Sequence, residues 1–311
     1  MKKYYSKLCC VCLLALCVVA LVVSAHAAEG DYNGNIHWEL HDGVLTVSGS
    51  GEMPPDGAIP WAPMRDSIKE IIVSEGITSI GNKVFSHCTQ ATKLTLPESL
   101  KHIGKEAFFG CSKLERVIIP ANNLWKIEYG AFEGCSGIRE VHISDLASWC
   151  KLSFDDFGSN NPFRTGAALY LDGTLVTQLV LPVGFVLEST FCFSGCTSLE
   201  SVVLPRGLKS IPAFCFSKCP NLRFVVMPAS VKHIGQGAFF ACNQLEYVFY
   251  GGSKRQMEKI DIHPLSNEKL TNTPWIAWKQ SLGLDFWTVT VNLAIVIACF
   301  ALEHRQRKYG Y

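Results

Sequence analysis

A phenylalanine followed three residues later by a cysteine recurs six times in the middle of this chain, and no other feature constrains its fold as strongly. The pairs are Phe85/Cys88, Phe108/Cys111, Phe132/Cys135, Phe193/Cys196, Phe216/Cys219 and Phe239/Cys242, at steps of 23, 24, 61, 23 and 23 residues. A repeat of this length is typical of a solenoid, in which each coil buries its apolar face only by stacking on its neighbours.

Further apolar positions follow the same period. An isoleucine stands five residues before the phenylalanine in five units, and after the cysteine comes a strand pattern that ends in proline, as in Leu114 to Pro120. The fourth unit has Glu188 at the isoleucine position, so Val186 or Leu187 must take its place. The alternation predicts short parallel strands, with one more strand at 176–181 inside the long step.

The unit from Ile103 to Pro120, Ile-Gly-x-x-Ala-Phe-x-Gly-Cys-x-x-Leu-x-x-Val-x-Ile-Pro, resembles the BspA-like class of leucine-rich repeats of bacterial surface proteins. The resemblance covers roughly Ile68 to Gly252. It implies a leucine-rich-repeat solenoid, either an α/β-type horseshoe or a right-handed coil that is mostly strand and loop. It also implies an extracellular binding or adhesion scaffold without common catalytic residues.

Both ends of the chain are apolar and indicate export. Residues 1–27 combine a basic start, an apolar run and Ala25-His26-Ala27, which is typical of a signal peptide; an uncleaved membrane helix is the alternative. Residues 285–303 predict a C-terminal transmembrane helix and residues 304–311 a basic cytoplasmic tail, with a surface-lying helix as the alternative. We therefore expect secretion by the general route, anchoring in the cell membrane, and repeats outside.

Three segments lie between these ends. Residues 28–66 predict an N-terminal antiparallel β cap, because alternating strands flank the turn dipeptide Asp42-Gly43. Residues 67–252 hold the repeats, with an irregular coil at about 144–182, and residues 253–284 form a C-terminal cap and linker.

Composition and cysteine spacing argue against several functions. The 28 basic and 27 acidic side chains balance, so the chain lacks the charge that nucleic-acid binding requires. We expect the repeat cysteines to be buried free thiols, which serine should replace at a higher cost than alanine. A disulfide between Cys192 and Cys215 is the alternative.

The scattered histidines do not suggest catalysis or metal binding. His37 and His41 lie four residues apart on a predicted strand, about 13 Å from one another, and cannot share a metal ion. Cys150 with His142 lacks a third group to orient the base. We expect no enzymatic activity, no cofactor and no small-molecule substrate.

The outward face of the strands remains as the candidate for function. We give the name apolar row to the outward residues of the last coils: Val180, Val203, Phe224, Val226, Tyr247 and Phe249. Exposed apolar and aromatic side chains in a row predict contact with a protein or glycoprotein at a cell surface. Two alternatives stay open: residues 253–283 bury this row, or the chain is a structural envelope protein with no specific ligand.

Overall fold

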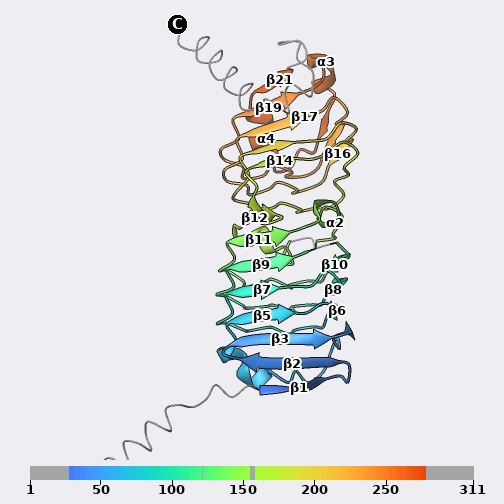
Figure 1. Cartoon of the computed structure of the whole chain (residues 1–311). Coiled ribbons are helices and arrows are strands. Elements are labelled where there is room, and N and C mark those ends of the chain that lie inside the picture. Colours follow the sequence, from blue (N-terminus) through green and yellow to red (C-terminus); the bar gives the residue numbers. More distant parts are fainter. Residues whose placement is uncertain (1–27, 121, 155–157, 278–311) are drawn as a thin grey trace, which may run out of the picture.

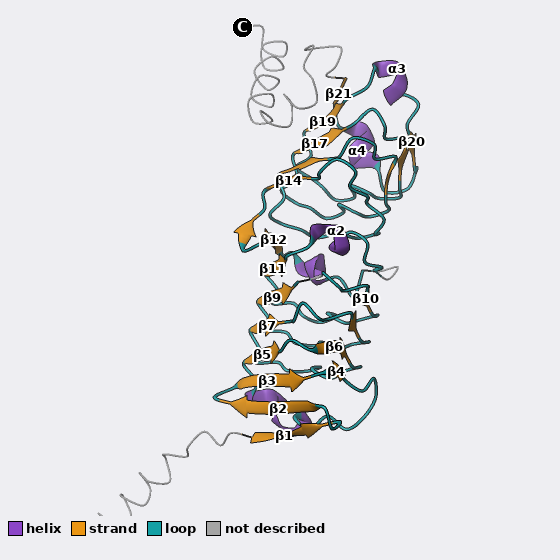
Figure 2. Cartoon of the chain, turned by 45° about the vertical axis from the view of Figure 1, so that its right-hand side comes forward, coloured by secondary structure: helices purple, strands orange, loops and turns teal. Residues whose placement is uncertain are grey.

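The computed structural model describes residues 28–120, 122–154 and 158–277, which form a straight stack of coils (Figure 1). The expected signal peptide lies outside these residues. Each coil has three sides: a long strand, a short strand roughly opposite, and a turn side that contains the core phenylalanine and cysteine (Figure 2). The repeats have a short second strand where an α/β-type horseshoe has a helix, so they form a coil that is mostly strand and loop.

An antiparallel cap starts the stack. It consists of β1 (Ala28–Tyr32), β2 (Ile36–His41) and β3 (Val44–Gly49), in which β2 alternates buried and exposed residues. The β2–β3 hairpin turns at Asp42 and Gly43, both at positive φ, as the Asp-Gly dipeptide predicts. The sequence did not predict β1. Strand β3 then pairs in parallel with the first repeat strand, so the cap covers the open edge of the repeats.

The first half of the molecule is built on two sheets. The long strands after the cap are β5 (Glu70–Val73), β7 (Lys93–Thr95), β9 (Arg116–Ile119), β11 (Glu140–Ile143) and β12 (Ala168–Leu171). The short strands are β4 (Gly51–Glu52), β6 (Ile77–Ile80), β8 (His102–Ile103) and β10 (Lys126–Ile127). The long sheet ends where β12 turns back in an antiparallel pair with β13 (Thr174–Leu175).

The second half has its own pair of sheets. The long strands are β14 (Gln178–Val180), β15 (Ser201–Val203), β17 (Phe224–Met227), β19 (Tyr247–Tyr250) and β21 (Trp275–Ala277), and the short strands are β16 (Ser210–Ile211), β18 (His233–Ile234) and β20 (Asp261–Ile262). Strand β14 confirms the strand expected at 176–181. In this coil Glu188 stands where the others have isoleucine, five residues before the core phenylalanine. Leu187 is buried and Val186 is exposed, so Leu187 takes the place of the missing isoleucine.

Short helical segments occupy the cap, the region between the halves, and the last coil. They are η1 (Ala62–Ser67), α2 (Leu146–Trp149), η2 (Pro162–Thr165), α3 (Lys254–Met257) and α4 (Glu268–Asn272). Segments α2 and η2 lie between the two halves in Figure 2. Side chains cap α2 and α3: Asp145 accepts from two backbone N–H groups, and Ser253 forms a capping box with Gln256.

Aromatic stacking fills the core. We call the coils of Phe85, Phe108 and Phe132 the N-terminal array and those of Phe193, Phe216 and Phe239 the C-terminal array. Within each array the rings are nearly parallel and buried, at centroid distances of 5.2–5.5 Å. Such offset stacks combine burial of apolar surface with a favourable ring geometry.

A buried tryptophan precedes each array. Trp61 donates its indole N–H to the carbonyl of Val84, and Trp149 donates to the carbonyl of Cys192, both at 3.0 Å. Each acceptor directly precedes the first core phenylalanine of its array. Trp61 continues the stack onto Phe85 at 5.5 Å, so the N-terminal cap and the repeats share one core.

The predicted fold class needs one correction, which concerns the C-terminal transmembrane helix. No helix among the described residues is long and apolar enough to cross a membrane. Residues 285–303, to which the prediction assigned that helix, lie outside the described residues. The described residues form a β-solenoid with an antiparallel start.

Candidate functional site

The apolar row lies on the outward face of the C-terminal sheet. One line across β14, β15, β17 and β19 consists of Val180, Val203, Val226 and Phe249. Phe224 and Tyr247 stand in the adjoining line, with ring planes 6° apart and centroids 6.4 Å apart. The 23-residue period therefore sets the register of these outward positions as well as that of the core.

Most of the row is buried, contrary to the open surface that we expected. The buried members are Val203, Phe224, Val226 and Phe249. The rings of Phe224, Tyr247 and Phe249 also lie near one another, with centroids 6.1–6.4 Å apart. Burial raises the pKa of the Tyr247 phenol. Val180, with 49% of its surface exposed, is the most exposed member, and Tyr247 is partly buried.

Residues 253–277 do not lie across this face as a lid. They form a further coil that adds β20 to the short sheet and β21 to the edge of the long sheet, beside β19. The rest of the segment that was expected to fold over the row, residues 278–283, lies outside the described residues.

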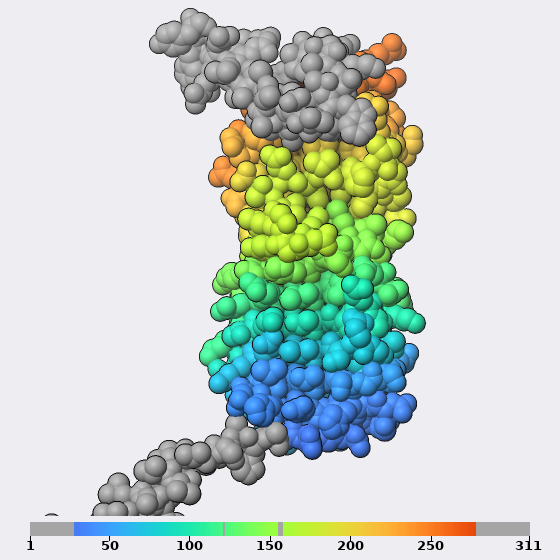
Figure 3. Space-filling view, viewed as in Figure 1, coloured from blue at the N-terminus to red at the C-terminus, as the bar shows by residue number. Residues whose placement is uncertain are grey.

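Exposed aliphatic side chains are frequent in residues 175–186, where the first long sheet ends and the second begins. We call them the junction patch: Leu175, Val180, Val183 and Val186, each 46–65% exposed. They make up half of the large hydrophobic side chains that the described residues expose. The yellow-green residues of this region reach the surface in Figure 3. Sequence analysis identified only Val180. The available signal was the close spacing of Val180, Val183 and Val186 around Pro182 and Gly184, where the strand alternation ends.

The N-terminal sheet has a charged outward face. Its charged row consists of Glu70, Lys93, Arg116 and Glu140, aligned across four parallel strands. Lys93 pairs with Glu70 at 2.7 Å, and Arg116 pairs with Glu140 at 2.6 Å. The Arg116 hydrogen bond, followed by that of His142, holds the pKa of Glu140 below its usual range. The charges of this row are therefore paired mainly with one another.

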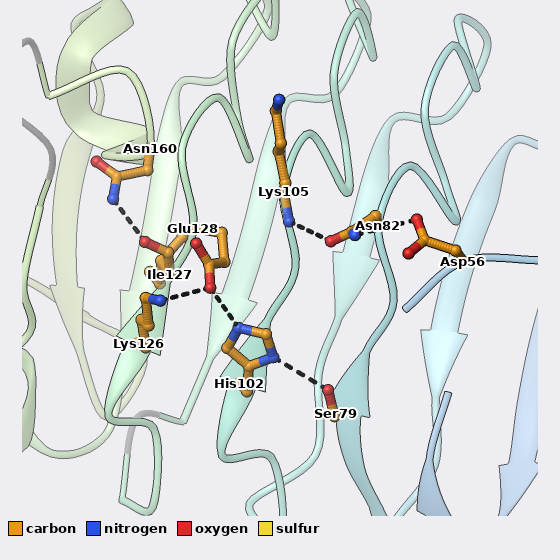
Figure 4. A network of polar contacts seen from close by, with 9 residues as sticks. All are labelled: Asp56, Ser79, Asn82, His102, Lys105, Lys126, Ile127, Glu128 and Asn160. Carbon is orange, nitrogen blue, oxygen red and sulfur yellow. Dashed lines mark hydrogen bonds and ion pairs between the residues drawn. The ribbon is translucent and has the colours of Figure 1, made fainter. Parts of the chain in front are cut away.

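A second polar surface follows the short strands of the N-terminal half (Figure 4). His102 lies between the Ser79 hydroxyl and the Glu128 carboxylate, at 3.2 Å from each. Lys126 also binds Glu128, and this contact lowers the pKa of that carboxyl most. Beside the network Trp125 is 63% exposed and stacks on His102 at 5.7 Å. Sequence analysis missed this surface because its members come from three different coils.

The repeat cysteines are buried free thiols, as the sequence predicted. The structure adds that they are hydrogen-bonded. Each of four thiols donates to the carbonyl of the core phenylalanine one coil earlier, at 3.0–3.2 Å: Cys111, Cys135, Cys219 and Cys242. Burial raises the pKa of Cys219 well above the ordinary thiol value. Burial and these hydrogen bonds make the four side chains parts of the core.

The candidate catalytic pair of Cys150 and His142 does not form a site. Cys150 is buried and its sulfur lies 3.2 Å from that of Cys192, both being free thiols. Burial is the main cause that raises the pKa of each. His142 lies on the outward face, stacked on Tyr170 at 4.4 Å and bonded to Glu140.

His37 and His41 are surface residues of the cap. Each lies near an aspartate, Asp31 at 3.5 Å and Asp42 at 3.4 Å respectively. Within residues 28–120, 122–154 and 158–277, no three His, Cys, Asp or Glu side chains are grouped so that they could hold a metal ion.

Solved structures with the same kind of repeat cover most of the chain at low identity. A leucine-rich repeat protein from Eubacterium ventriosum is 20% identical over 71% of this chain and 84% of its own, with a TM-score of 0.28. A leucine rich cell surface protein from Faecalibacterium prausnitzii is 18% identical over 76% and 98%, with a TM-score of 0.34. The T. pallidum leucine rich repeat protein is 22% identical over 68% and 89%, with a TM-score of 0.37.

No curated protein matches the chain. The family comparison is more informative than these structural likenesses. The BspA type leucine rich repeat region matches in six copies, over residues 64–160 and 171–277. These two spans correspond to the two halves of the solenoid. The chain belongs to the family of proteins with BspA type leucine rich repeats.

Proposed function

We propose that this chain is a cell-surface binding scaffold that contacts a protein or glycoprotein partner through the outward side of its long sheets. The junction patch is the observation that carries the proposal. Four half-exposed aliphatic side chains in a stretch of twelve residues are unusual for a surface that only faces water. Within the apolar row, Val180 belongs to this patch, and we propose it as the row's direct contact.

The architecture supports a scaffold role because the interior and the surface of each coil are independent. Core phenylalanines, cysteines and inward strand residues repeat from coil to coil, whereas outward residues change from charged in the N-terminal array to apolar in the C-terminal array. A solenoid of this kind holds a partner on a long surface whose residues can vary without loss of the core. A protein surface with an apolar patch of its own would be complementary to the junction patch.

The test is binding of the purified full-length chain to cultured epithelial cells and to bacterial cells. We expect saturable binding that is lost when the cells are first treated with a protease. The double variant Val180→Asp with Val183→Asp should weaken binding at least tenfold, because a charge in an apolar contact must be desolvated without a partner.

Leu265→Asp is the matched control, since Leu265 is 58% exposed and lies in the last coil, far along the chain from the junction patch. It should bind as the unmodified chain does, and all variants should melt at similar temperatures. A chain that shows no saturable binding to any of these cells would be a structural envelope protein, and the proposal would be wrong.

A further inference from the structure

The turn side of the C-terminal array contains a cavity that the proposed function does not use. Its volume is about 540 Å³, within the range of small-ligand sites. Its lining includes the rings of Phe191, Phe214 and Phe240 and the hydroxyls of Ser194 and Ser217. Backbone bonds between the coils fix its shape, for example Phe193 N to Cys215 O and Gly195 N to Ser217 O, both 2.8 Å.

Two neighbouring coils at the cavity differ from the others in the combination of residues at two positions. Directly after the core phenylalanine, the coils carry in order Ser86, Phe109, Glu133, Ser194, Ser217 and Phe240. Two residues before it they carry Lys83, Glu106, Gly130, Phe191, Phe214 and Gly237. The two coils at the cavity thus combine a small residue at the first position with an aromatic residue at the second.

Phe191 and Phe214 hold a backbone conformation that large residues rarely adopt. Their φ angles are +59° and +55°, but the equivalent position has a positive φ in every coil, where it is held by Lys83, Glu106, Gly130 and Gly237. The conformation therefore belongs to the turn of the repeat and is not special to the cavity. What distinguishes these two coils is the aromatic side chain at this position. Both rings are only partly buried, and Phe191 packs against the core.

The two rings line the cavity as a stacked pair. They stack on each other at 4.9 Å with planes 8° apart, so one face of each is occupied. Both rings also lie close to glycines: a Cβ on Gly158 would come within 3.2 Å of the Phe191 ring, and one on Gly237 within 2.5 Å of the Phe214 ring. Aromatic edges carry partial positive charge, so an edge of these rings that meets a ligand favours oxygen atoms and anions.

The remaining lining groups have the same preference. Arg164 and Lys218 line the cavity, and the described lining residues include no acid. The buried hydroxyls of Ser194 and Ser217 bond each other at 2.7 Å. That bond uses one of their two protons and leaves the other for a further acceptor. Gln236 contributes an amide that can both donate and accept.

We propose that this cavity binds an acidic sugar, with its carboxylate at Arg164 and Lys218 and its hydroxyls at the serine pair and Gln236. A bare anion is far smaller than the space, because a water molecule occupies only about 30 Å³ in the liquid. The site lies on the turn side and not on the long sheet, so it is independent of the protein contact proposed above.

Isothermal titration of the full-length chain with glucuronic acid tests the proposal, with glucose as the neutral control. Glucuronic acid should bind at least tenfold more tightly than glucose, and Arg164→Gln should weaken it at least tenfold. Ser217→Phe should abolish binding, because it fills the cavity with the residue that the next coil carries at this position. Ser86→Phe makes the same substitution in the first coil, and it should leave binding unchanged.

Methyl glucuronide distinguishes the source of the sugar. Binding as tight as that of glucuronic acid indicates the end of a glycan chain, whereas binding of the free sugar alone indicates a soluble acid; either result supports the site. The proposal is overturned if glucuronic acid does not bind, or if it binds the unmodified chain, the Arg164→Gln variant and the Ser217→Phe variant equally. None of these variants changes a residue of the junction patch. Cell binding through that patch and sugar binding in the cavity are therefore measured independently of each other.

Discussion

The core phenylalanines of the N-terminal array stack at 5.5 and 5.2 Å, and those of the C-terminal array stack at 5.5 Å in both steps. A buried tryptophan precedes each stack, with the same indole hydrogen bond to the residue before the first phenylalanine. The outward positions differ. At matched places in the register the N-terminal sheet has Arg116 and partly buried Ile118, and the C-terminal sheet has buried Phe224 and Val226.

This contrast teaches that the repeat specifies the interior alone. Stacked coils require the same inward residues at every period, because each core position packs on its equivalents above and below. Outward positions carry no such requirement, so one array can present ion pairs and the other apolar side chains on the same scaffold. Function in this molecule is therefore to be sought where the outward residues change, which is at the junction and along the C-terminal array.

The largest expected effect tests whether the two interiors are equivalent. Phe108→Ala and Phe216→Ala each remove the middle ring of a stack, and each should lower the free energy of unfolding by about 3–5 kcal/mol. Denaturant titration of both variants measures this. Costs that differ by more than about 2 kcal/mol would mean that the arrays are not filled alike.

A smaller effect should separate the two outward faces. Val226 is fully buried and its counterpart Ile118 is only partly buried. Val226→Thr puts a hydroxyl into an apolar contact and should cost about 1–3 kcal/mol, whereas Ile118→Thr should cost less than about 1 kcal/mol. Thermal melting of both variants decides the matter. Equal costs would show that the faces do not differ in burial.

The cysteines provide a third comparison, in which serine should be better tolerated than sequence analysis predicts. The Cys219 thiol donates to the Phe193 carbonyl at 3.2 Å, and a serine hydroxyl can donate to the same acceptor. Cys219→Ser and Cys219→Ala should therefore have similar costs, about 1 kcal/mol. Differential scanning calorimetry should also show no effect of a reductant on the unmodified chain; a lower melting temperature in reductant would mean that cysteines are paired.

The smallest effect concerns the charged row in acid. Arg116 and His142 lower the pKa of Glu140 in the folded chain, so this group stabilises the fold at pH values above its ordinary pKa of about 4.3. The contribution is lost as the pH falls through the lower folded value. Between pH 7 and pH 3 the unmodified chain should lose about 1–3 °C more in melting temperature than Glu140→Gln. An equal loss of melting temperature in the unmodified chain and in Glu140→Gln would contradict this role of the charged row.

The repeat period was sufficient to predict the coils, the strand in the long step, the outward positions and the free thiols. It could not predict burial of Val203, Val226 and Phe249, because an outward position is exposed or buried according to what else packs there. Nor could it predict the acceptor for each thiol, which depends on the distance between coils. The positive φ that every coil has two residues before its core phenylalanine could not be predicted either, because residues as different as Lys83, Gly130 and Phe191 hold it.

The contrast between the two faces also indicates which measurement tests the proposed function most directly. This is the salt dependence of binding to cells. Contact through the apolar junction patch should give saturable binding whose affinity changes less than about threefold between 0.1 and 0.5 M salt, because apolar contacts are not screened. Binding through the charged row should weaken about tenfold or more over the same range. A steep loss of affinity with salt, or binding that never saturates, would contradict the account.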